Sequence, residues 1–163
     1  MKQRDLLAHL DKEAIAHAIA DAEKSCSGEI RVHVQPRLFG HDLATVAERT
    51  FERLGMTRTA ARNGVLIFIA AKEQKFVVLG DRGIHEKVGP QFWEEIAGVM
   101  TDRFRSGQFT EGIVEAIRLA GSQLYAFFPP NIALILSNNS IFAPCLRMIT
   151  LCCATDSELF QAQ

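Results

Sequence analysis

An aspartate between two glycines is the first residue of this chain whose type and setting could do chemistry. Asp81 follows an apolar run that ends at Leu79, within the turn Gly80-Asp81-Arg82-Gly83. A carboxylate at the end of a buried strand could bind Ca²⁺ or Mg²⁺ through oxygen, with Glu86 as a second ligand. The alternative is that Asp81 only fixes the turn by a hydrogen bond to its own backbone. The sequence therefore predicts either a divalent metal site or a structural turn.

Basic and amide side chains before the preceding apolar run form a candidate phosphate site. Arg58, Arg62 and Asn63 lie together in a polar loop, and a guanidinium can hold a phosphate through two parallel hydrogen bonds. The alternative is that Arg62 pairs with Asp81 and holds the loop, while Asn63 and Gly64 supply a tight bend. The structural alternative is somewhat favoured over phosphate binding.

Three polar residues at alternate positions, Glu29, Arg31 and His33, form a third candidate. They could act as a general acid/base row, because histidine titrates near neutral pH. They could equally form ion pairs on a partly covered sheet face, and a histidine beside one acid without a nucleophile favours that reading. The chain has no phosphate-binding glycine loop, no Gly-x-Ser-x-Gly and no cysteine with a fitting histidine. Catalytic residues therefore stay unassigned.

Apolar periodicity predicts the elements that position these residues. Apolar residues at helical spacing predict helices over 11–24, 43–54, 90–105 and 110–128, while strands are predicted over 29–35, 64–71 and 75–79. Asp42 is expected in the first turn of its helix, Thr110 as an N-cap, and Phe109 as a staple onto Val114. The order predicts one α/β domain, a three-layer α/β/α sandwich whose small mixed sheet contains one β-hairpin and carries helices on both faces.

The predicted hairpin also predicts where the candidate site lies. The 56–63 loop precedes its first strand, and the 80–87 turn follows its second. Antiparallel pairing brings these two segments to the same end of the sheet. We therefore expect Arg62 and Asp81 to lie close together.

Composition and charge narrow the function classes. The chain has 163 residues, enough for one ordinary domain, and 18 Lys+Arg against 19 Asp+Glu give a net charge of −1. This balance gives no reason to expect nucleic acid or an acidic membrane surface as a partner. The first residues contain no apolar run typical of a signal peptide, so a cytoplasmic location with reduced cysteines is expected.

The last residues differ in kind from the rest. We expect residues 1–130 to form the domain, and residues 131–163 to be an atypical apolar tail rather than a separate domain. Its apolar patches, Ile132–Leu136 and Ile141–Cys153, are shorter than the roughly 20 residues that cross a bilayer. For this tail, an apolar appendage is the favoured interpretation, a partner-binding segment is the second and a membrane anchor is the third. A homodimer formed through the tail is an open alternative.

Several short strings along residues 10–129 resemble one known family in their order and spacing. They include Ser27-Gly28-Glu29-Ile30-Arg31-Val32, Leu54-Gly55-Met56, Arg62-Asn63-Gly64-Val65, Gly80-Asp81-Arg82-Gly83-Ile84, Phe92-Trp93 and Phe128-Pro129. This combination resembles the TPM domain family, formerly a domain of unknown function, whose relatives include a plant thylakoid acid phosphatase and photosystem II repair proteins. The match looks closest to the soluble or membrane-tethered bacterial members.

The resemblance implies a three-layer fold, a divalent metal site in some members and phosphatase activity in at least one. Gln91 stands near a position where members with a metal site often carry aspartate. One expectation is an accessory or interaction module of unassigned cellular role, with an unknown protein partner and a bound Ca²⁺ or Mg²⁺ as an option. The alternative is a metal-assisted acid phosphatase acting on phosphomonoesters, with Asp81 and Glu86 on the metal and Arg58 or Arg62 on the phosphate. No organic cofactor is expected.

Overall fold

The computed structural model describes residue 6 and residues 9–130 of the chain. In chain order its elements are α2 (Lys12–Lys24), β1 (Glu29–Gln35), α3 (Leu43–Arg53), the 3₁₀ helix η1 (Met56–Arg58), β2 (Gly64–Ala70), β3 (Lys75–Gly80), α4 (Arg82–Val88), α5 (Pro90–Arg105) and α6 (Phe109–Phe127). The expectations about residues 131–163 lie outside the described residues.

The sheet in the described part of the chain has three strands in the order β1-β2-β3. Strand β1 pairs with β2 in parallel, from Glu29 opposite Gly64 to Gln35 opposite Ala70. Strand β3 pairs with β2 in the antiparallel sense, with Gly80 opposite Val65. The predicted mixed sheet with one hairpin is therefore confirmed.

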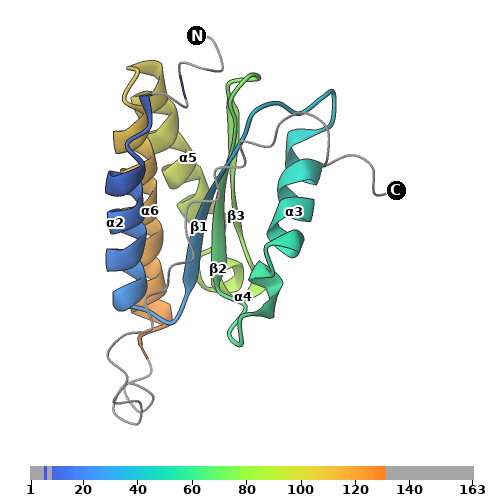
Figure 1. Cartoon of the computed structure of the whole chain (residues 1–163). Helices are drawn as coiled ribbons and strands as arrows, with labels where there is room; N and C mark the ends of the chain where they lie inside the picture. The colour runs from blue at the N-terminus through green and yellow to red at the C-terminus, as the bar shows by residue number, and fades with distance from the viewer. Residues whose placement is uncertain (1–5, 7–8, 131–163) are drawn as a thin grey trace.

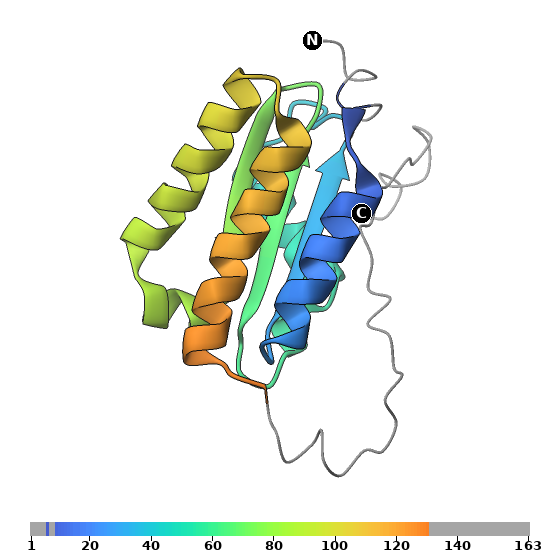
Figure 2. The same cartoon turned by 90° about the vertical axis from the view of Figure 1, so that its left-hand side faces the viewer.

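Helices cover both faces of this sheet. Figures 1 and 2 show α2, α6 and α5 side by side over one face, while α3 lies over the other. All residues of β2 are buried, as expected for an uninterrupted apolar strand at the centre of a three-layer arrangement. The predicted α/β/α fold is confirmed.

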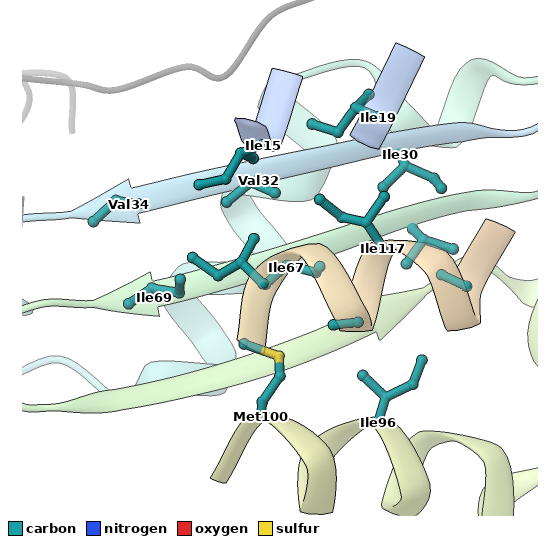
Figure 3. Close-up of a cluster of buried hydrophobic side chains, with 14 of the residues drawn as sticks. Ile15, Ile19, Ile30, Val32, Val34, Ile67, Ile69, Ile96, Met100 and Ile117 are labelled. Atoms are coloured by element: carbon teal, nitrogen blue, oxygen red, sulfur yellow. The ribbon is translucent and has the colours of Figure 1, made fainter. Parts of the chain in front are cut away.

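The larger of two apolar cores fills the space between the sheet and α2, α5 and α6. Figure 3 shows Ile117 of α6 and Met100 of α5 in this core, beside Ile67 of β2. All three side chains are fully buried. Helix α6 has buried residues along most of its length, including Ile113, Ala116, Ala120 and Leu124, so it is the main cover of this face.

A smaller core lies beneath α3 on the opposite face. Leu66 and Phe68 of β2 pack there with Phe51 of α3 and Met56 of η1. Alternate residues of β2 thus enter the two cores, which is the physical reason for its continuous apolar sequence.

The structure differs from the sequence prediction at three helices. Helix α4 lies in the 80–87 segment, where the sequence predicted a turn. Asp42 is the N-cap of α3, accepting a hydrogen bond from the Thr45 amide at 3.0 Å, rather than a first-turn residue. The prediction of Thr110 as N-cap was wrong, because α6 begins at Phe109 and its N-cap is Gln108, two residues before Thr110. The Thr110 hydroxyl instead accepts a hydrogen bond from the backbone amide of Asp11 at 3.0 Å.

Candidate functional site

The side chains of Arg62 and Asp81 join the two loops that were predicted to meet. Arg62 Nε donates to Asp81 Oδ2 at 2.7 Å, and Arg62 Nη2 donates to Asp81 Oδ1 at 2.8 Å. The Asp81 side chain is 5% exposed and that of Arg62 is 41% exposed. The predicted proximity is therefore confirmed, and it takes the form of a two-point charge-assisted contact.

Backbone contacts hold the same two loops together. Asp81 N donates to Gly64 O at 2.8 Å, and Ile84 N donates to Arg62 O at 3.3 Å. A β-carbon on Gly83 would lie 2.1 Å from Ala61 O, so only glycine permits this close approach. The loop bends at Arg62, whose φ of +52° lies in the left-handed region. The tight bend expected at Asn63 and Gly64 thus falls one residue earlier.

Asp81 also begins the helix that follows it. As the N-cap of α4, its Oδ1 accepts a hydrogen bond from the Arg82 amide at 2.7 Å. Burial by itself raises the pKa of the Asp81 carboxyl. The hydrogen bonds from Arg62 and the Arg82 amide, with the two positive charges, outweigh burial and hold that pKa below its ordinary value. The carboxylate is thus ionised and engaged through both oxygens.

Glu86 faces a different neighbour. It stands five residues beyond Asp81 along α4, and its carboxylate lies 4.0 Å from Arg82 Nε, with both side chains largely exposed. Within residues 9–130 and Leu6, no three histidine, cysteine, aspartate or glutamate side chains gather closely enough to hold a metal ion. The structure therefore brings Arg62 to Asp81, while the ion-pair partner of Glu86 among the described residues is Arg82.

The three candidate phosphate residues lie in different settings. Arg58 is exposed at the end of η1, whereas Asn63 is only 1% exposed. The side-chain nitrogen Nδ2 of Asn63 donates to Ser27 Oγ at 3.4 Å. The backbone amide of Asn63 donates to Thr59 Oγ1 at 3.1 Å. Asn63 Oδ1 is buried without a hydrogen-bond partner. Asn63 therefore ties its loop to the connection between α2 and β1.

The polar row on β1 is built into the sheet. Arg31 Nε donates to Glu29 Oε1 at 2.6 Å, so the two form an ion pair along one strand. His33 is fully buried and stacks on Phe68 with ring centroids 5.4 Å apart. Burial lowers the pKa of His33, more than the hydrogen bond with Gln35 raises it. The structure thus shows the kind of ion pair that the sequence favoured for Glu29 and Arg31, and it places His33 inside the fold.

Sequence reasoning did not foresee how Ser27, Thr59 and Trp93 support this end of the sheet. A β-carbon at Gly80 would lie 2.3 Å from the Trp93 ring, and Trp93 stacks on His85 at 6.3 Å between ring centroids. A glycine inside a strand is the one sequence signal for such a close approach.

The fold and this two-loop contact define a small three-layer α/β/α domain. The family model of the TPM domain matches residues 1–123, and the chain belongs to that family. The chain is also 40% identical to the BA42 protein of the psychrophilic bacterium Bizionia argentinensis, whose structure was solved by NMR. The TM-score is 0.68, and the match covers 72% of this chain and 81% of that one. Among curated proteins no match was found.

In the described part of the chain, every helix is too short or too polar to cross a bilayer.

Proposed function

We propose that this TPM domain is a non-catalytic accessory or interaction module. The observation that carries the proposal is the contact of Asp81 with Arg62, because it uses both oxygens of the carboxylate that was the best candidate for chemistry. A third donor, the Arg82 amide, shares Oδ1. The residue thus has a complete structural role.

Metal binding would have to compete with this contact. A cation at Asp81 would meet the positive guanidinium of Arg62 at less than 3 Å from both carboxylate oxygens. Removing Arg62 from a nearly buried carboxylate costs free energy that the cation must offset. Glu86 would also have to leave its position beside Arg82. The displacement of Arg62 favours the accessory role over a metal-dependent one, whereas the movement of the exposed Glu86 costs little.

The alternative function, a metal-assisted acid phosphatase, has one observation in its favour. The guanidinium of Arg62 is partly exposed beside the turn, and Arg58 of the same loop is exposed as well. Two cations on one loop can orient a phosphomonoester. In this alternative Ca²⁺ or Mg²⁺ would sit on Asp81 and Glu86.

Hydrolysis of p-nitrophenyl phosphate by the full chain, with Ca²⁺, Mg²⁺ or a chelator, separates the two functions. The accessory role predicts no metal-dependent turnover and no difference between the wild type and Asp81→Asn. Asp102→Asn, on an exposed position of α5, is the matched control. Turnover that needs the metal, disappears in Asp81→Asn and persists in Asp102→Asn would overturn the accessory role and establish the phosphatase.

A further inference from the structure

A large apolar pocket lies at the end of the sheet opposite the contact between Arg62 and Asp81. Its volume is about 770 Å³. The turn between β2 and β3, the last turns of α5 and the start of α6 line it, together with Leu6 and with Leu43 at the start of α3. Figure 1 shows these segments together at one end of the molecule. Pockets of several hundred cubic ångströms with mostly apolar walls are typical of small-molecule sites.

Three phenylalanines form one wall of this pocket. Phe76 and Phe104 meet edge to face with ring centroids 5.4 Å apart, and Phe104 and Phe109 lie 5.2 Å apart. All three line the pocket and are partly exposed there. Because each ring packs against another, the wall is held in place without a ligand. It offers an apolar surface suited to an alkyl chain.

The charged residues among the described lining of the pocket are both positive. Lys75 and Arg105 line it, and none of its described lining residues is acidic. Both cations are exposed, and neither makes an ion pair with a carboxylate of the described residues. Arg103, two residues before Arg105, shows the contrast, because its Nε binds Glu115 Oε2 at 2.9 Å. The pocket therefore combines an apolar wall with two available positive charges.

We propose that this pocket binds an amphipathic anion with a single alkyl chain, such as a fatty-acid carboxylate. The chain lies against the three phenylalanines, and the carboxylate is held by Lys75 and Arg105. Charge complementarity favours this occupant over a neutral apolar one, because a carboxylate can bind the two exposed cations at the pocket and a neutral head group cannot form these ion pairs. The inference does not depend on the accessory role, since the site is at the other end of the sheet.

Titration of the full chain with dodecanoate, below its micelle concentration and at about pH 7.5 where a carboxylate is ionised, tests the proposal. We expect saturable binding of one dodecanoate per chain, and a Kd for dodecanol that is at least about tenfold higher. The double variant Lys75→Gln/Arg105→Gln should lower the affinity for dodecanoate by about tenfold or more and leave the affinity for dodecanol unchanged. Lys87→Gln, an exposed lysine of α4, is the control for lost charge.

A second variant tests the apolar part of the site. Ala97 of α5 lines the pocket, so Ala97→Phe should fill it and weaken both ligands, while a thermal melt verifies that the variant folds. Absence of saturable binding, equal affinity for dodecanol, or indifference to the loss of both cations would each overturn the proposal.

Discussion

At the scale of single residues, Asp81 connects three parts of the structure: the Arg62 loop, the end of β3 and the start of α4. In Asp81→Asn the side chain is neutral and has one acceptor oxygen, so it cannot accept both hydrogen bonds from the Arg62 guanidinium. We expect the free energy of unfolding near neutral pH to fall by about 2 kcal/mol. Urea unfolding of the variant beside Asp102→Asn measures this.

The difference in stability between wild type and Asp81→Asn should depend on pH. The folded-state pKa of Asp81 lies below the ordinary value of 3.8. Its stabilisation is therefore present above that value and is lost as the pH falls through the folded pKa. The difference between wild type and Asp81→Asn should shrink on acidification from about pH 5 downward. A difference that stays constant with pH would contradict this account.

Two glycines make a matched pair for testing the close approach of the loops. A β-carbon at Gly83 would meet the carbonyl oxygens of Ala61 and Arg62 at 2.1 and 2.7 Å, whereas nothing lies within 4 Å of one at Gly98. We expect Gly83→Ala to lose at least about 2 kcal/mol of stability. Gly98→Ala, in the middle of α5, should gain about 0.5–1 kcal/mol. Equal melting temperatures for the two variants would show that the loops separate easily.

His33 should make the stability of the fold sensitive to mild acid. Its pKa in the folded state lies below the ordinary 6.5 because the ring is buried. The unfolded chain therefore takes up the proton first, so stability falls as the pH drops below about 6.5. His33→Phe keeps a ring on Phe68 and cannot be protonated. Denaturant unfolding at several pH values should show a flatter profile for His33→Phe between about pH 5 and 6.5; an unchanged profile would assign the dependence to other groups.

At the scale of elements, α6 is the helix on which the larger core depends. Ile117 is fully buried against the sheet (Figure 3), while the adjacent Arg118 is exposed. Ile117→Ala removes buried methyl groups and leaves a cavity, so we expect a loss of about 3 kcal/mol. Arg118→Ala should change stability by less than about 0.5 kcal/mol. Chemical denaturation of both variants checks the contrast, and a small effect at Ile117 would mean that neighbouring side chains refill the space.

At the scale of the whole molecule, α6 is the last element of the described layers. The Ser27 amide donates to Phe128 O at 2.9 Å, which fastens that end to the connection between α2 and β1. A chain ending at Pro130 should therefore fold and melt within about 5 °C of the full chain. Thermal unfolding with gel filtration of both proteins tests this and any dimer formed through residues 131–163. A melting temperature lower by more than about 10 °C would place part of those residues in the core.

The sequence by itself determined the sheet and its long helices. Three local patterns indicate the sheet: the alternation in Glu29–Gln35, the apolar run of β2 and the short turn before Lys75. They predict a mixed sheet with a hairpin between β2 and β3, and the structure has this sheet. The same patterns located the meeting point of Arg62 and Asp81. This was possible because antiparallel pairing in a hairpin places the start of the first strand and the end of the second strand at the same end of the sheet.

Only the tertiary structure decided what those residues do. Helix α4 has seven residues, too few for a clear apolar period, and it is supported by the Asp81 cap and by the contact at Gly83. Thr110 accepts a hydrogen bond from Asp11, a residue 99 positions away. Whether Asp81 meets Glu86 or Arg62 depends on the direction of each side chain. That direction follows from packing between segments distant in sequence, which no local pattern contains.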